Sequence, residues 1–143
     1  GQQTWGESRS LALKLNRFSI RSALFLRCRG MQRPAKMQHI SPNDLYLWLQ
    51  DSSRAAPQLL DVREPWEVAL CQIDGSQNLP MNHIPSEQTR LDPDATYVVI
   101  CHHGVRSYQV AGFLERQGFE NMINLDGGIA AWANDVEPNM ARY

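Results

Sequence analysis

A run of apolar residues that ends in a cysteine constrains the fold of this chain more than any other feature. The run Tyr97-Val98-Val99-Ile100 has no polar alternation, which is typical of a strand buried on both faces of a sheet. After Cys101, the apolar residues of 107–117 recur at helical spacing, and Ser107 is a favourable helix N-cap. A buried strand that leads straight into a helix predicts an α/β domain with a mostly parallel sheet.

The rest of 37–143 supports the same fold class, because short apolar runs alternate with helical patterns there. Strands are predicted at 37–40, 58–62, 77–80, 96–100 and 119–125. Helices are predicted after Ser41 and at 64–70, 107–117 and 129–132. The strand 96–100 is expected to be central and 37–40 to lie at an edge. Active sites of parallel sheets lie at the carboxyl ends of strands, which is where Cys101 stands.

Charge is distributed unevenly along the chain. The formal net charge is −1, yet residues 1–36 carry eight Lys and Arg against one acid, whereas residues 37–143 carry six against fourteen. We interpret this as a basic leader, residues 1–36, on an acidic domain, residues 37–143. An acidic domain argues against nucleic acid as the main partner.

The basic leader has three interpretations. Its stretch 8–29 contains Arg and Ser, is poor in acids and is loosely amphipathic, like a mitochondrial transit peptide. The favoured interpretation is an upstream extension or a cloning remnant, because Met31 and Met37 could each be a natural start. In the third, a helix over 11–26 packs on the domain or on another subunit. We expect a cytoplasmic protein, or a mitochondrial one if the leader is a transit peptide.

The three cysteines do not form a recognisable framework. Cys28, Cys71 and Cys101 are an odd number and include no CxxC pair, so neither disulfides nor a zinc site of ordinary spacing is expected. Reduced thiols in an intracellular compartment fit this pattern better. No apolar run approaches the ~20 residues that a membrane span needs.

The segment Cys101-His102-His103-Gly104-Val105-Arg106-Ser107, the Cys101 loop, is the predicted active site. A cysteine before a helix N-terminus lies in the field of unpaired backbone N–H groups, which favours its thiolate form. Gly104 allows the tight curl or the positive φ that such a loop needs. The N–H groups of 102–107 are expected to surround an anionic sulfur atom and to bind its donor.

Three motifs follow one another through residues 37–135. The first is Leu60-Asp61-Val62-Arg63-Glu64, followed by Trp66-Glu67. The second is the Cys101 loop. The third is Gly118-Phe119-Glu120-Asn121, followed by Asn124-Leu125-Asp126-Gly127-Gly128-Ile129 and Trp132. In type, order and spacing they resemble the rhodanese-like domain family of single-domain sulfurtransferases, in which the basic leader has no counterpart.

The resemblance implies a fold and an activity. The fold is a doubly wound, mostly parallel sheet of about five strands flanked by helices. The activity is that of a thiosulfate sulfurtransferase: Cys101 takes sulfane sulfur from a donor such as thiosulfate, holds it as a persulfide and passes it to cyanide, a small thiol or a protein acceptor. No cofactor is expected. A non-catalytic module that binds a partner or senses persulfide is the main alternative, and the intact cysteine disfavours it.

The length of the loop separates sulfur transfer from phosphate transfer. Phosphatases of related architecture use Cys-x5-Arg, whereas Cys101 and Arg106 here form Cys-x4-Arg. The smaller ring suits one sulfur atom better than a tetrahedral oxyanion. No Asp is convincingly placed as a general acid, so a phosphatase or an arsenate reductase is a weaker alternative.

The side chains around the cysteine have expected roles of their own. His102 and His103 are adjacent in sequence, and two adjacent side chains rarely bind the same ion, so no metal site is expected. The two histidines either line the mouth of the pocket or are exposed residues without a role in the site. Arg106 is expected either to orient an anionic donor or, in the favoured interpretation, to hold the loop by pairing with a carboxylate, for which Asp61 and Glu67 are the candidates.

Three residues of the first motif also have expected roles. Asp61 is interpreted as bracing the Cys101 loop, and Arg63 as a second supporting residue. Trp66 is expected to pack in the core or against the pocket wall.

Overall fold

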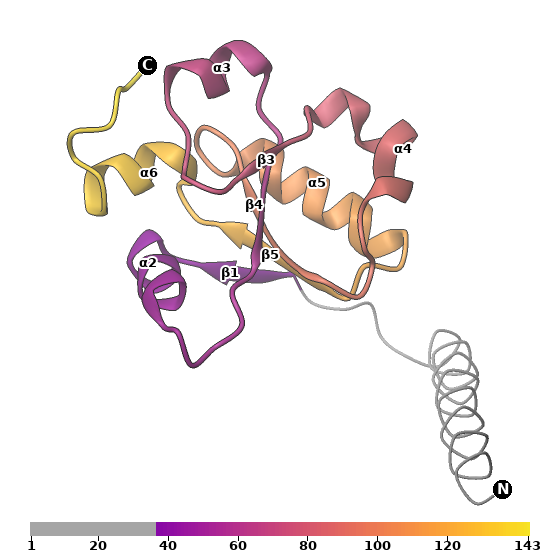
Figure 1. Ribbon diagram of the computed structural model, residues 1–143. Helices are drawn as coiled ribbons and strands as arrows, with labels where there is room; N and C mark the ends of the chain where they lie inside the picture. The colour runs from indigo at the N-terminus through magenta and orange to yellow at the C-terminus, as the bar shows by residue number, and fades with distance from the viewer. Residues whose placement is uncertain (1–36) are drawn as a thin grey trace, which may run out of the picture. The chain divides into compact units, whose positions relative to one another are not determined.

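The computed structural model describes residues 37–143, which form a five-stranded sheet with helices on both faces (Figure 1). The strands are β1 Gln38–Ile40, β2 Gln58–Asp61, β3 Gln77–Asn78, β4 Thr96–Ile100 and β5 Asn121–Leu125. Their order is β1-β5-β4-β2-β3, and every neighbouring pair is parallel. The predicted doubly wound α/β fold is confirmed, with β4 central and β1 at an edge. The basic leader lies outside the described residues.

The described residues form five α-helices, of which the first four lie between strands and the last follows β5. They are α2 Pro42–Gln50, α3 Pro65–Leu70, α4 Ile84–Glu87, α5 Val105–Arg116 and α6 Gly128–Asp135. The predicted start of α2 is confirmed, since Ser41 Oγ accepts the Asp44 N–H at 3.1 Å. The sequence analysis missed α4, which is one turn long between two 3₁₀ turns and too short to show a period. In residues 37–143 no helix has the length and apolarity to cross a bilayer.

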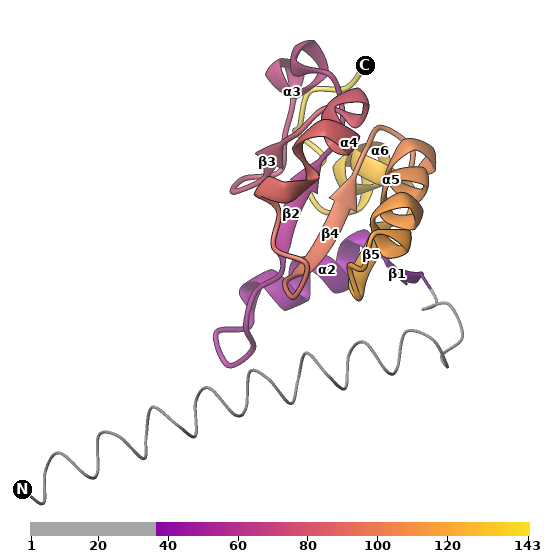
Figure 2. The same cartoon turned by 90° about the vertical axis from the view of Figure 1, so that its right-hand side faces the viewer.

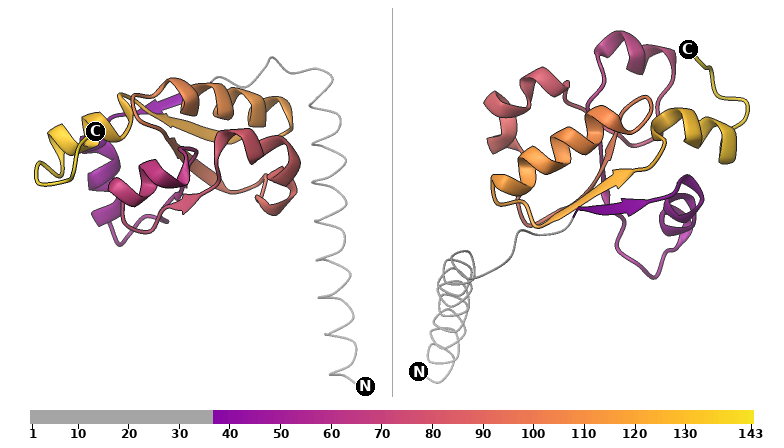
Figure 3. Two further views of the ribbon diagram at one scale, coloured as in Figure 1. Left: turned by 90° about the horizontal axis from the view of Figure 1, so that it is seen from above. Right: turned by 180° about the vertical axis from the view of Figure 1, so that it is seen from behind.

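The sheet is buried on both faces, and its side chains alternate between two cores. Tyr97 and Val99 of β4 pack into the core that α5 covers, whereas Val98 and Ile100 pack into the core that α2 and α6 cover. Figure 3 shows α2 and α6 together at one side of the sheet and α5 at the other. This two-sided burial explains why β4 reads as a continuous apolar run.

The carboxyl ends of β2 and β4 lie side by side (Figure 2). Asp61 is in register with Ile100, and the Val62 N–H donates to the Ile100 carbonyl at 2.9 Å. α5 and α6 both begin at this edge, directly after β4 and β5. The topology therefore brings the Cys101 loop together with the ends of three strands and the N-termini of two helices.

Candidate active site

Cys101 directly follows β4, and its own loop turns back over it. The residue is only 1% exposed, and its Sγ accepts the Gly104 N–H at 3.0 Å. Gly104 has a φ of +99°, and a Cβ there would lie 3.1 Å from the Gly127 nitrogen. Both the left-handed conformation and the close approach favour glycine, as the sequence predicts.

Ser107 is not the helix N-cap that the sequence analysis expects. α5 begins at Val105 with Gly104 as its N-cap residue, so Ser107 lies inside the first turn and is buried. The physical reason is that its hydroxyl is used elsewhere: Ser107 Oγ donates to Asn124 Oδ1 at 2.5 Å. The N–H groups of residues 105–107 are the first three of α5, which have no acceptor within a helix. The backbone donor seen on Sγ among residues 102–107 is the Gly104 N–H, and that the first N–H groups of α5 bind an anion stays a prediction.

Ser107 also lies against the cysteine, with Oγ 3.2 Å from Cys101 Sγ. A hydroxyl carries one hydrogen, and Ser107 directs it to Asn124, so its lone pairs can accept the hydrogen of a neutral thiol. Asn124 holds the loop a second time through Nδ2, which donates to the Gly104 carbonyl at 3.3 Å. The sequence analysis did not single out Asn124 as a site residue. The sequence feature that could have identified it is a polar residue within the otherwise apolar, buried part of strand β5.

The start of α6 fixes the loop from the other side. The Ile129 N–H donates to the Cys101 carbonyl at 2.8 Å, and the Ala130 N–H donates to the His102 carbonyl at 3.0 Å. A Cβ at Gly128 would lie 2.5 Å from both carbonyl oxygens, and its φ is +62°. Only glycine allows the two backbones to approach this closely.

Arg106 pairs with Glu67, one of its two candidate partners. Both guanidinium nitrogens Nη1 and Nη2 donate to the Glu67 carboxylate, each at 2.7 Å. This bidentate contact, helped by the Glu64 N–H and the Tyr143 hydroxyl, lowers the pKa of Glu67 to about 2. Glu67 is therefore ionised at neutral pH, and it fixes the guanidinium of Arg106, a residue of the Cys101 loop.

Asp61, the other candidate, bonds Arg63 instead. Both side chains are fully buried, and Arg63 Nη2 donates to Asp61 Oδ2 at 2.7 Å. Arg63 Nη2 also donates to the Cys71 carbonyl at 2.7 Å. Burial alone would lower the pKa of Arg63, but its hydrogen bonds with Asp61 and Tyr143 outweigh this and raise it. The pair thus ties the end of β2 to the segment after α3, next to the loop rather than on it.

The two histidines occupy different environments. The His102 ring lies between the rings of His103 and Tyr143, with both centroid distances at 3.9 Å. Burial, followed by the nearby His103, lowers the pKa of His102, so its neutral form is favoured. His103 is exposed. Within residues 37–143 no three His, Cys, Asp or Glu side chains gather as metal ligands.

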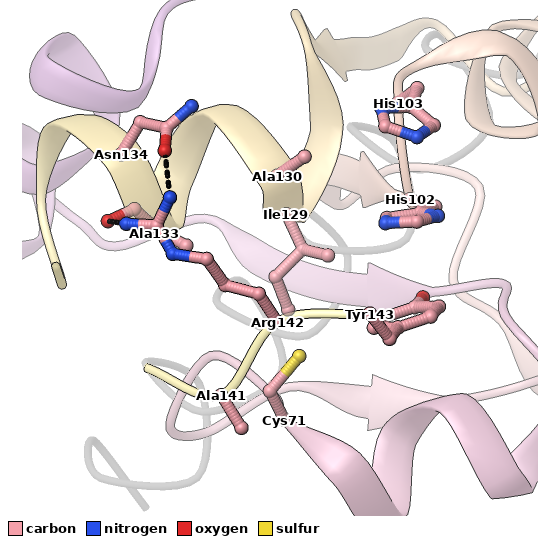
Figure 4. A pocket seen from close by; sticks show the side chains of 10 residues that line it. All are labelled: Cys71, His102, His103, Ile129, Ala130, Ala133, Asn134, Ala141, Arg142 and Tyr143. Carbon is pink, nitrogen blue, oxygen red and sulfur yellow. Dashed lines mark hydrogen bonds between the residues drawn. The ribbon is translucent and has the colours of Figure 1, made fainter. Parts of the chain in front are cut away.

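A pocket of about 140 Å³ opens beside the two histidines (Figure 4). Its walls come from the Cys101 loop, α6, Cys71 and the C-terminal segment 141–143. Nothing in the sequence marked Tyr143 as part of the site. Trp66 was expected in the core or pocket wall, but it is 62% exposed and forms an edge-to-face ring contact with Tyr143. The short helix α3 directs Glu67 inward, which leaves Trp66 on its outer side.

Comparisons with known proteins agree with this geometry. The family model of the rhodanese-like domain matches residues 41–135. The probable adenylyltransferase/sulfurtransferase MoeZ of Mycobacterium tuberculosis is 38% identical over 111 residues, 76% of this chain but 28% of that protein. The thiosulfate sulfurtransferase GlpE of Pseudomonas fluorescens is 40% identical over 84 residues, 59% of this chain and 77% of that protein. The chain thus spans little more than a quarter of MoeZ.

Solved structures show the same fold. The crystal structure of a rhodanese-like domain protein from Staphylococcus aureus superposes with a TM-score of 0.64 at 31% identity. The match covers 70% of this chain and 95% of that one. With the family model, the motifs and the sheet topology in agreement, the chain belongs to the rhodanese-like domain family.

Proposed function

We propose that this protein is a sulfurtransferase that carries sulfane sulfur as a persulfide on Cys101. The observation that carries the proposal is the position of Cys101 Sγ. It lies at the carboxyl end of the central strand, inside a loop whose Gly104 N–H points at it from 3.0 Å. The names of the relatives, sulfurtransferase and thiosulfate sulfurtransferase among them, support the same activity.

The reaction has two balanced half-steps. In the first, the Cys101 thiolate attacks the outer sulfur of thiosulfate, a new S–S bond forms, the thiosulfate S–S bond breaks and sulfite leaves with the electron pair. In the second, cyanide or a thiolate attacks the terminal sulfur of the persulfide. Thiocyanate or a new persulfide leaves, and the Cys101 thiolate is restored. Neither half-step needs an external oxidant or reductant.

The site's residues suit an anionic donor and an anionic intermediate. The first N–H groups of α5 and the Gly104 N–H are fixed neutral donors that stabilise negative charge on sulfur. Arg106 supplies a positive charge beside the loop, because Glu67 fixes its orientation while its side chain stays about one-third exposed. His102 and His103 of the Cys101 loop line the pocket, and we expect a donor or acceptor to approach the loop past them. A small thiol or the thiol of a partner protein are both acceptors of suitable chemistry.

Intact mass spectrometry tests the proposal. After incubation with thiosulfate and removal of excess donor, the protein is expected to gain the mass of one sulfur atom. Addition of cyanide should remove that mass and produce thiocyanate. Cys101→Ser should abolish both results, and Cys28→Ser, the matched control, should keep them. Absence of sulfur uptake by the unaltered protein would instead support a non-catalytic module, and hydrolysis of aryl phosphates would support a phosphatase.

The same assay tests the proposed division of the chain at residue 36. Removal of residues 1–36 is expected to leave sulfur loading and turnover unchanged, because 37–143 contains the complete loop and both cores. A large loss of turnover or of thermal stability would show that the basic leader takes part in the domain.

A further inference from the structure

Tyr143 joins the two arginine–carboxylate pairs near the active site. Its hydroxyl donates to Glu67 Oε1 at 2.8 Å and accepts from Arg63 Nη1 at 3.0 Å. Glu67 Oε1 is also the acceptor of Arg106 Nη2. A continuous side-chain connection therefore runs from the buried Asp61–Arg63 pair through Tyr143 to the arginine beside Cys101.

The ring of Tyr143 makes a second, separate contact with the active loop. It stacks on His102 with a centroid distance of 3.9 Å and an interplanar angle of 10°. Figure 4 shows the two rings face to face, with Tyr143 at the edge of the pocket. The phenol hydroxyl and the ring thus hold two different residues of the Cys101 loop, Arg106 through Glu67 and His102 directly.

We infer that Tyr143 is a positioning residue for the proposed sulfur-transfer site. It orients the two loop residues, Arg106 and His102, that an anionic sulfur donor meets. Through its hydroxyl it fixes the Glu67 carboxylate and hence the direction of the Arg106 guanidinium. Through its ring it keeps His102 stacked beside the pocket. The inference rests on the proposed function for its substrate class, but each contact can be measured without any sulfur transfer.

The two contacts can be separated by substitution. Tyr143→Phe keeps the ring and removes the hydroxyl, so Arg106 loses part of its support while His102 keeps its stack. Tyr143→Leu removes both contacts. Tyr46→Phe is the matched control, because Tyr46 is an exposed tyrosine on α2 with no part in this connection.

Steady-state kinetics with thiosulfate provides the first measurement. Tyr143→Phe loses both hydrogen bonds of the hydroxyl but acts on Arg106 only through Glu67. It should therefore raise KM about fivefold and leave kcat within about twofold. Tyr46→Phe should match the unaltered protein. An unchanged KM in Tyr143→Phe would overturn the inference. A lower kcat together with a lower melting temperature, at an unchanged KM, would also overturn it, because that result would indicate a structural role only.

Alkylation of Cys101 reads the position of Arg106 without a sulfur donor. Iodoacetate is an anion and iodoacetamide is neutral, so the ratio of their rates at Cys101, followed by peptide mass, reports the positive charge near Sγ. This ratio should fall severalfold in Tyr143→Phe and stay constant in Tyr46→Phe. A constant ratio in Tyr143→Phe would overturn the inference even if the protein proved active.

NMR titration of His102 reads the ring contact. The groups that face His102 are His103, Glu67, Arg106 and Tyr143. Loss of the stacked ring relieves burial, so Tyr143→Leu should raise the pKa of His102 toward its ordinary value, whereas Tyr143→Phe should not. An unchanged titration in Tyr143→Leu would overturn this part. If wild-type protein takes up no sulfur while both donor-free measurements shift as expected, the proposed function fails and the positioning role of Tyr143 stands.

Discussion

Two arginine–carboxylate pairs lie near Cys101, and they differ in burial. Arg63 and Asp61 are both 0% exposed, whereas Glu67 is 5% and Arg106 34% exposed at the side chain. Both carboxylates accept their arginine at 2.7 Å. The two pairs thus have equal contact distances but different surroundings: the Arg63 side chain has no contact with solvent, whereas about a third of the Arg106 side chain is exposed.

This difference separates a scaffold role from a chemical one. The donors of Arg63 are used by Asp61, by the carbonyls of Glu67 and Cys71 and by Tyr143, so little remains to meet a substrate. Arg106 has its Nη1 and Nη2 on one carboxylate and lies partly in solvent. We therefore expect changes to the Asp61–Arg63 pair to act on stability alone, and changes to the Glu67–Arg106 pair to act on the handling of an anion as well as on stability.

The largest effect is expected from breaking the buried pair. Asp61→Ala leaves the Arg63 charge without its carboxylate in the interior, which should cost about 3–5 kcal/mol of unfolding free energy. Chemical denaturation of the variant, compared with the unaltered protein, measures this loss.

A double variant is the control for this loss. Asp61→Leu combined with Arg63→Met removes both charges and should lose less stability than Asp61→Ala alone. If the single and double variants were equally unstable, the packing of this region rather than the uncompensated charge would explain the loss.

The second effect is the pH dependence of the Glu67–Arg106 pair. The pKa of Glu67 is about 2 in the fold, below the ordinary value of 4.5. A lowered pKa stabilises the fold above pH 4.5, and this stabilisation is lost as the pH falls toward 2, by up to about 3 kcal/mol. The free energy of unfolding measured between pH 7 and pH 2 tests this.

Two variants sharpen this pH test. Glu67→Gln should differ from the unaltered protein most at neutral pH and converge with it near pH 2. Glu120→Gln, which changes an exposed carboxylate, should follow the unaltered protein throughout. A gap between Glu67→Gln and the unaltered protein that stayed constant down to pH 2 would mean that the charge of Glu67 contributes nothing.

The two pairs also show which features of the site could be predicted from the sequence and which could not. The strand–helix alternation predicted the parallel sheet, and the spacing of Cys101 and Arg106 marked the loop, because both are local patterns. The sequence left Asp61 and Glu67 as equal partners for Arg106. The choice depends on Arg63, which folds back two residues to take Asp61 and so leaves Glu67 free.

Other features were out of reach for the same reason. Tyr143 lies 76 residues from Glu67 in sequence, and no local period connects them. Ser107 has the composition of an N-cap, but its bond to Asn124, a long-range contact, moves the helix start to Val105. Contacts made across the sheet edge decide these details, whereas apolar periodicity decides the elements.

The third prediction concerns the fork of Arg106. Arg106→Lys keeps the charge but replaces two parallel hydrogen bonds by one point contact, so its direction over the loop is lost. We expect about a tenfold fall in kcat/KM for thiosulfate, with less than about 1 kcal/mol of lost stability. Arg116→Lys, on the exposed last turn of α5, is the matched control and should behave like the unaltered protein. A larger loss of stability than of activity would reverse the distinction between the two pairs.

The smallest effect is expected from a third pair that extends the comparison to the surface. Arg90 donates to Glu87 at 3.1 Å, and its side chain is 66% exposed. Because both groups remain hydrated, Arg90→Ala should change the unfolding free energy by less than about 0.5 kcal/mol and leave sulfur transfer unchanged. Denaturation in low and high salt checks this. A cost comparable to that of Asp61→Ala would mean that burial is not what distinguishes these pairs, since contact distance varies little among the three.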